Sequence, residues 1–200
     1  RLADDPEFFD RKTFLGAQTE FNFSSLNDAL NPSKGMNFDL EVGAKLNLDD
    51  TDRAYAFVNP NLEFYNPLTP DERLVLRTQA LSEINFGNQF EFYQAASAGS
   101  HNALRGYRRN RFLGQQSLIG SGDLRYSFNQ FKTGVVPLQF GVFGGYDIGR
   151  VWSDVNPSDR WNDNYGGGVW FTAADLLQGT LNLFYGDDDL FFSFQVNVSL

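Results

Sequence analysis

The alternation that decides the fold runs from Met36 to Leu48 and reads MNFDLEVGAKLNL. Every even-numbered residue in it is apolar, and every odd-numbered one is polar, charged or glycine. Successive side chains of a β-strand point to opposite faces, so this stretch has one apolar and one polar face. Strict alternation over 13 residues exceeds the length of an ordinary globular strand, about five or six residues, and suits a tilted strand that crosses a bilayer.

The same alternation recurs along most of the chain. We expect ten strands, at residues 13–23, 36–48, 53–65, 73–86, 89–98, 117–128, 135–152, 164–174, 179–186 and 190–200. The connectors between them alternate in length, the long ones being 24–35, 66–72, 99–116 and 153–163. Long loops on one side and tight turns on the other are typical of outer-membrane barrels, whose long loops are extracellular.

These features together predict an all-β fold in a bacterial or organelle outer membrane. It is a transmembrane antiparallel up-and-down β-barrel of about ten strands, formed by residues 13–200. An even number of strands returns both ends of a barrel to the periplasm. Residues 1–12 are therefore expected to be a periplasmic lead-in.

Composition narrows the function. The chain has 200 residues, a net charge of −9, no cysteine and one histidine. So acidic a protein lacks the spread basic surface that nucleic-acid binding needs. The absence of cysteine excludes disulfides and Cys-ligated metals. A single histidine also makes a zinc site or a Ser-His triad improbable. We expect no metal, no cofactor and no enzymatic activity, whereas 21 Phe, 8 Tyr and 3 Trp suit the aromatic girdles of a membrane barrel.

A soluble β-sandwich or a lipocalin-like barrel is the alternative fold, because its strands alternate as well. In such folds the apolar face points inward and the strands are shorter. Strand length and the asymmetry of the connectors favour the membrane barrel.

A run of arginines interrupts this acidic chain at residues 101–112, HNALRGYRRNRF, on the longest loop. An arginine that enters a barrel lumen needs a carboxylate partner, because an unpaired charge removed from water is costly. Asp123 and Asp147 lie on the polar faces of the next two expected strands. Arg108, Arg109 and Arg111 are expected to be solvated, to line the lumen or to face lipopolysaccharide.

Short motifs recur from this loop to the end of the chain. The loop motif is Leu104, Arg105, Gly106 and Tyr107. It resembles the pattern [V/I/L]-R-G-[F/Y] of the BamA-like superfamily of outer-membrane assembly and secretion barrels. Asp147 and Gly149 resemble the strand motif F-x-D-x-G, although Gly145 stands where the family has an aromatic residue. Residues 120–123, ending in Asp123, resemble the element on the intervening strand. The final alternation resembles the family's terminal strand signal and consists of Phe192, Phe194, Val196, Val198 and Leu200.

The resemblance covers residues 89–200 well and residues 11–88 only by their alternation, so it implies the C-terminal part of the family barrel. It implies that the loop folds into the lumen, where Arg105 contacts Asp147 of the strand motif and where Asp123 and Gly149 are further lumen partners. Arg105 and Asp147 are then either a purely structural pair or part of a gating cycle.

The function implied is insertion or translocation of proteins at the outer membrane. The alternative is a compact barrel that anchors, or forms a narrow pore for, a fused or associated patatin-type or phosphatase-type domain. A barrel enzyme acting on lipids ranks last, because no histidine-centred constellation exists. The expected partners are outer-membrane lipid and lipopolysaccharide, client β-strands or a fused domain, and a second copy of the chain; nucleic acid is not expected.

Overall fold

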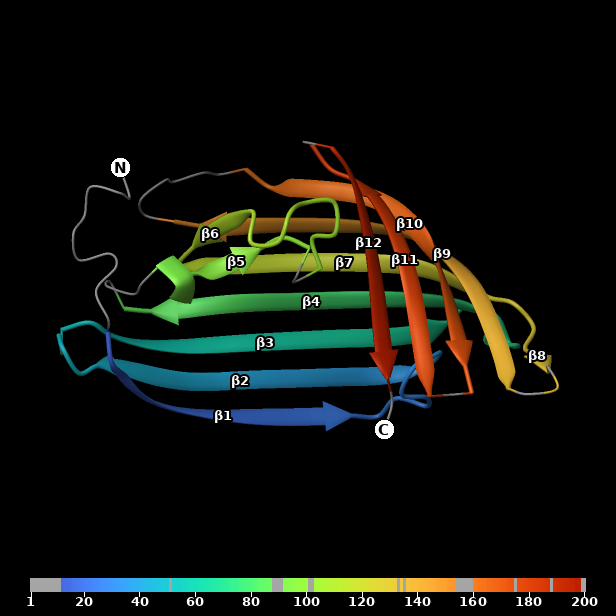
Figure 1. Ribbon diagram of the computed structural model, residues 1–200, viewed down its shortest axis with the longest axis horizontal. Helices are drawn as coiled ribbons and strands as arrows, with labels where there is room; N and C mark the ends of the chain where they lie inside the picture. The colour runs from blue at the N-terminus through green and yellow to red at the C-terminus, as the bar shows by residue number, and fades with distance from the viewer. Residues whose placement is uncertain are drawn as a thin grey trace.

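The structure is a computed structural model that describes residues 12–50, 52–87, 92–100, 103–132, 134, 136–153, 160–174, 176–187 and 189–198. Its elements (Figure 1) are β1 (Phe14–Ser24), β2 (Gly35–Asn47), β3 (Ala54–Pro67), β4 (Leu74–Phe86), the 3-10 turn η3 (Phe92–Gln94), β5 (Ala96–Ala98), β6 (Phe112–Gly114), β7 (Gln116–Ser127), β8 (Phe131–Lys132), β9 (Pro137–Trp152), β10 (Asn162–Ala173), β11 (Leu177–Tyr185) and β12 (Leu190–Val198). Leu200 and the expected lead-in, except for residue 12, lie outside the described residues.

One antiparallel sheet contains almost all of these strands. Its order is β1-β2-β3-β4-β7-β9-β10-β11-β12, with the short β8 paired to β9, which makes ten strands. Neighbours in the chain are therefore neighbours in the sheet. The predicted all-β, antiparallel up-and-down arrangement of about ten strands is confirmed. In the described part of the chain, no helix is long and apolar enough to cross a membrane.

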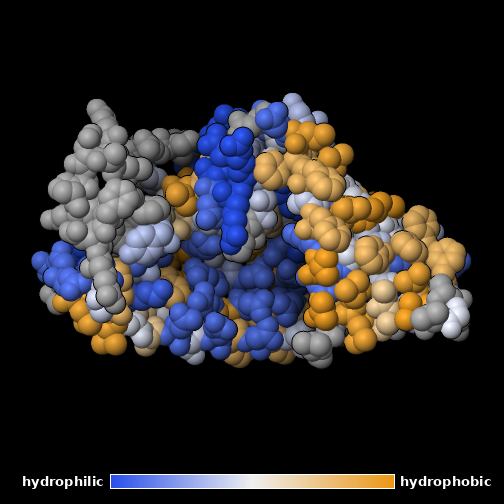
Figure 2. Space-filling view, viewed as in Figure 1, coloured by the Kyte–Doolittle hydropathy of each residue, from blue (hydrophilic) through white to orange (hydrophobic). Residues whose placement is uncertain are grey.

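The two faces of the sheet have opposite character. On β7, Ser117, Ser121 and Asp123 are buried on the inner face, whereas Leu118 and Leu124 are exposed on the outer face. The inner faces from β2 to β12 surround a cavity of about 800 Å3, here called the lumen. Figure 2 shows this hollow lined by hydrophilic side chains, with hydrophobic side chains gathered beside it. Within the described residues no ladder joins β1 to β12.

The predicted fifth strand, at residues 89–98, is wrong. Only residues 96–98 form a strand, β5, and it pairs with β6 in a separate two-stranded sheet. β4 pairs directly with β7, from Leu74 opposite Tyr126 to Ile84 opposite Gln116. All three residues of β5 are buried. The alternation of alanine and serine there therefore reflects small side chains packed inside the lumen rather than a lipid-facing and a water-facing side.

Because residues 89–98 do not form a strand of the main sheet, the connectors lie at other ends of the sheet than predicted. Connectors alternate ends in an antiparallel sheet, so 25–34 and 68–73 lie at the end opposite the long connector 87–115. The prediction that the long connectors all share one side is therefore wrong. For the same reason, Phe14 at the start of β1 and Val198 at the end of β12 lie at opposite ends of the sheet. Within the described residues, the two-residue β8 is the tenth strand of the sheet, and the nine longer strands are an odd number, so the expected return of both ends to one side is not seen.

Candidate functional site: a loop clamped inside the lumen

The described residues between β4 and β7, 92–100 and 103–115, form the lumen loop, which lies against the inner face of the sheet. Its centre is a tight turn in which the Tyr107 N–H donates to the Leu104 carbonyl over 3.3 Å. Leu104 and Tyr107 are buried with Ala98 of β5 and Ile119 of β7. The two apolar residues of the loop motif thus hold the turn against the wall by burying hydrophobic surface.

The glycines of the motifs allow this close contact. A Cβ on Gly106 would lie 2.6 Å from the Cβ of Asn164 on β10. A Cβ on Gly149 would lie 3.0 Å from Ile119 Cγ1 and 3.4 Å from Leu104 Cδ1. These three distances fall below ordinary van der Waals contact or at its lower limit, so a side chain at either glycine would push the loop away from the wall.

Arg105, in the same turn, bridges two carboxylates. Its Nε and Nη2 donate to Asp147 Oδ2 and Oδ1 over 3.1 Å and 2.6 Å, which makes a bidentate pair. Its backbone N–H also donates to Asp147 Oδ2, over 3.0 Å. The same Nη2 donates to Asp123 Oδ1 over 2.6 Å. The loop motif is therefore brought together with the two acidic residues that the sequence singled out.

The charged side chains of these contacts are buried. The side chain of Arg105 is 14% exposed, that of Asp123 5% and that of Asp147 0%. Desolvation acts to lower the pKa of the Arg105 guanidinium, but hydrogen bonds and charge from Asp147 and Asp123 outweigh it and raise this pKa above its ordinary value. Arg105 thus stays charged, and the two carboxylates keep a fixed cation between them. A planar guanidinium matches this geometry, which a lysine ammonium does not.

Aromatic rings close the site from the other side. The guanidinium carbon of Arg105 lies 4.1 Å from the ring centroid of Phe184 on β11 and 5.8 Å from that of Phe143 on β9. A Cβ at Gly145 would lie 2.2 Å from Asp123 Oδ1 and 2.7 Å from Arg105 Nη2. Glycine at this position leaves space for the ion pair, and Phe184 places a ring against the cation from β11, which β10 separates from β9.

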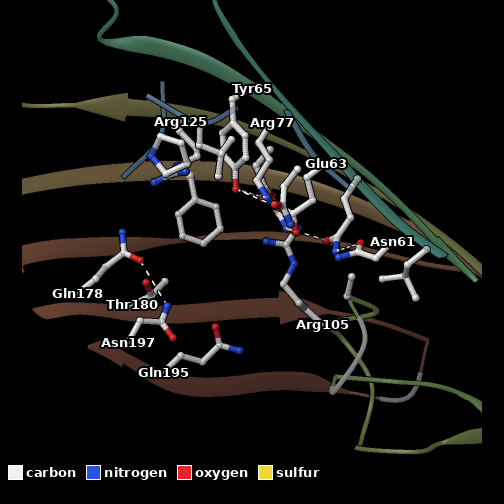
Figure 3. Close-up of a pocket in the computed structure, with 18 of the residues that line it drawn as sticks. Asn61, Glu63, Tyr65, Arg77, Arg105, Arg125, Gln178, Thr180, Gln195 and Asn197 are labelled. Atoms are coloured by element: carbon white, nitrogen blue, oxygen red, sulfur yellow. Dashed lines mark hydrogen bonds and ion pairs between the residues drawn. The ribbon is translucent and has the colours of Figure 1, made fainter. Parts of the chain in front are cut away.

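A second cation continues the network along the lumen wall. Asp123 Oδ2 accepts from Arg77 Nη1 over 3.1 Å, and Arg77 Nη2 donates to Glu63 Oε1 over 3.1 Å. Arg77 Nε donates to Tyr65 Oη, which in turn donates to Glu63. Figure 3 shows Arg105 reaching toward this group from the loop. Glu63, Tyr65 and Arg77 were not singled out from the sequence, where only their place on polar faces was visible.

Tyr107 fastens the far side of the turn. Its hydroxyl donates to the Asp163 carbonyl over 3.0 Å. The Asp187 backbone N–H donates in turn to the Tyr107 hydroxyl oxygen over 3.5 Å. Burial raises the pKa of Tyr107, so the phenol remains a donor over the physiological range. The turn is therefore held to β7, β9 and β10 and to the connector after β11.

The remaining predicted residues lie away from this site. Arg108, Arg109 and Arg111 are exposed. Phe192, Phe194 and Val196 of the terminal strand signal face outward, and Phe192 and Phe194 are 65% and 54% exposed; Val198 is exposed as well and also borders the lumen. In the part of the chain that the structure describes, no group of acidic or histidine side chains has the arrangement of a metal site.

The wall opposite the ion pairs is neutral. It presents Gln178, Thr180, Gln195 and Asn197 from β11 and β12 toward the cavity (Figure 3). The lumen thus combines the buried ion pairs of Arg105 with Asp147 and Asp123, here called the clamp, with a neutral hydrogen-bonding surface. This arrangement can position a loop or contact a polypeptide.

Comparison with known proteins fits this geometry. Residues 9–174 match the model of the Omp85 superfamily domain, so the family relation extends into the N-terminal half, where the sequence alone offered only alternation. The fold is similar to the crystal structure of BamA from Haemophilus ducreyi lacking POTRA domains 1–3, with a TM-score of 0.67 and 17% sequence identity. That alignment covers 90% of this chain and 41% of BamA, so the chain spans about two-fifths of the matched structure's length. No curated protein sequence matched the chain. Because the family model matches most of its length, the chain belongs to the Omp85 superfamily of outer-membrane proteins.

Proposed function

We propose that this protein takes part in the insertion or translocation of other proteins at the outer membrane. The observation that carries the proposal is the docked lumen loop, in which Arg105 joins Asp147 and Asp123 inside a member of the Omp85 superfamily. The structural relative described above supports the fold. The function rests on the family and on this clamp.

The docked loop directs client chains to the edge of the sheet rather than to the lumen. A loop fixed in the lumen by two buried carboxylates occupies the space through which an open pore would conduct. Client chains would then act at the rim of the sheet. Within the described residues β12 pairs with β11 along one edge only. An unpaired strand edge with lipid-facing phenylalanines is a template on which a client β-strand can add by backbone hydrogen bonds.

The partners follow from these surfaces. The outward residues of β12, Phe192, Phe194 and Val196, are suited to lipid. The exposed arginines Arg108, Arg109 and Arg111 are suited to the phosphates of lipopolysaccharide. Client β-strands would use the sheet edge, and a second copy of this chain would compete for it. The Arg105 clamp would act by positioning rather than by chemistry, so we propose no enzymatic role.

Reconstitution tests the proposal. Vesicles that contain the purified chain are mixed with a small outer-membrane β-barrel client diluted from urea, and folded client is measured by its heat-modifiable gel mobility and protease resistance. Vesicles with an unrelated barrel of similar size provide the control, because any barrel perturbs lipid packing. We expect faster client folding with this chain than with the control barrel. Equal rates in the two preparations would overturn the proposal.

The alternative role, as an anchor or narrow pore for a fused or associated enzyme domain, has no specific observation in its favour. It predicts the negative outcome of the same experiment.

A further inference from the structure

The connector between β1 and β2, residues 25–34, is a folded unit. Asp28 Oδ1 accepts the backbone N–H groups of Leu30 and Asn31 over 2.9 Å and 2.7 Å. Asn27 Oδ1 accepts those of Ser33 and Lys34, each over 3.0 Å. Short polar side chains that bond to nearby backbone in this way stabilise compact loops. The connector is therefore shaped by hydrogen bonds within itself.

This unit crosses the mouth of the lumen at the end opposite the lumen loop. Asn31 Oδ1 accepts a hydrogen bond from Arg125 Nη2 on β7 over 2.6 Å, and Asn31 Nδ2 lies 3.5 Å from Gln139 Oε1 on β9. In the sheet, β3 and β4 separate β2 from β7, and β9 lies one strand further. Strands are spaced about 4.8 Å apart. The connector therefore reaches roughly 19 Å along the curved sheet, from β2 to β9.

The inner side of the connector is apolar and faces the cavity. Leu26, Leu30 and Pro32 line the lumen, and Pro32 is buried. Ser33 at its base donates a hydrogen bond to Glu72 in the connector between β3 and β4. The segment thus has an apolar inner surface and polar side chains that hydrogen-bond to β7, β9 and the connector between β3 and β4. These contacts are typical of a plug rather than of a surface turn.

Arg125 is the main fastening point. It lies between the lumen and a smaller cavity of about 330 Å3 beneath the connector, and it lines both. Its guanidinium carbon lies 5.6 Å from the ring of Trp170 and 6.0 Å from that of Tyr65. The rings hold the cation in place while a neutral amide, that of Asn31, bonds to it. A neutral partner can be released with less loss of electrostatic energy than a carboxylate, unlike the fixed pairs of Arg105.

From these contacts we propose that residues 25–34 form a second plug that closes the end of the lumen opposite the lumen loop. The plug is latched by Asn31 on Arg125 and by Ser33 on Glu72, and release of the latch opens the lumen at that end. The inference goes beyond the role in client insertion and stands without it. It concerns a different end of the lumen and a different set of side chains.

Cysteine labelling tests the plug, because the chain contains no native cysteine. Leu30→Cys places a reporter on the inner side of the connector, and its rate of reaction with a membrane-impermeant maleimide is measured in reconstituted vesicles. Adding Asn31→Ala or Ser33→Ala removes one latch each. Asn129→Ala is the matched control, since Asn129 is exposed and lines the same small cavity. Heat-modifiable gel mobility confirms that each variant is folded.

We expect slow labelling in the latched parent and about tenfold faster labelling with Asn31→Ala, because a lost hydrogen bond to a charged group shifts the opening equilibrium by at least this factor. Ser33→Ala should accelerate labelling less, and Asn129→Ala not at all. Labelling of the parent as fast as that of an exposed Asn129→Cys reporter would overturn the proposal. An unchanged rate in a folded Asn31→Ala variant would overturn it as well. Neither readout depends on client folding, so failure here is distinct from failure of the insertion role.

Discussion

Replacing Arg105 by alanine should destabilise the fold more than replacing any other arginine of the loop. The change leaves Asp147, which is 0% exposed, without its cation, whereas Asp123 keeps Arg77. Removal of one partner from a buried ion pair costs about 3–5 kcal/mol. We expect a loss of this size, dominated by Asp147.

The assay is urea unfolding of the reconstituted chain, followed by tryptophan fluorescence and by heat-modifiable gel mobility. Arg108→Ala is the matched control, because Arg108 is exposed in the same loop and surface substitutions change stability by about 0.5 kcal/mol or less. Arg105→Lys should fall between the two, since it keeps a charge but loses the bidentate contact. In the double variant Arg105→Leu/Asp147→Asn, part of the loss should return, because no buried charge remains without a partner. A loss below about 0.5 kcal/mol for Arg105→Ala would refute the reasoning.

Three further predictions test separate parts of the account. Val42→Lys places a charge on the lipid face of β2 and should cost about 2–4 kcal/mol near the bilayer midplane, whereas Asn37→Lys on the lumen face should change stability little; equal unfolding midpoints would contradict the assignment of faces. Phe184→Leu removes the ring that stacks on the loop cation and should cost about 2 kcal/mol in urea unfolding, more than Phe→Leu at an exposed position. Gly106→Ala should cost about 1–3 kcal/mol and increase protease cleavage of the loop, because the new Cβ meets Asn164; an unchanged cleavage pattern would show that the turn is not in close contact.

The alternation of the sequence predicted the faces of the sheet well, because lipid on one side and a polar lumen on the other act on every residue of a strand. Leu118, Ser121 and Asp123 lie where the pattern of β7 indicates. Residues 89–98 show the limit of this reasoning. A short buried segment of small residues also alternates, and only the tertiary structure reveals that lumen loop and wall enclose both of its faces.

The site was predictable as far as its motifs reach. The sequence indicated that Arg105 needs a carboxylate and that Asp123 and Asp147 face the lumen. Its continuation through Arg77 and Glu63 depends on the register between β3, β4 and β7, which local sequence does not specify. The ring nearest to Arg105, that of Phe184, comes from β11 rather than from β9, the strand that carries Asp147. Sequence spacing does not reveal a contact between residues on separate strands.

The plug at residues 25–34 was not visible from the sequence at all. Its asparagines and serine read as an ordinary polar loop. What distinguishes it is the contact of Asn31 with Arg125, which are 94 positions apart in the chain.

The measurement that tests the central claim most directly is the rate of client folding in vesicles containing the wild-type chain, Arg105→Lys or Arg105→Ala, at equal amounts of folded protein. The account holds that a guanidinium clamp in the lumen supports client insertion at the sheet edge. It predicts that the wild type accelerates client folding, that Arg105→Lys retains part of the acceleration and that Arg105→Ala loses most of it. Equal acceleration by all three proteins would contradict the role of the clamp, and no acceleration by the wild type would contradict the function itself.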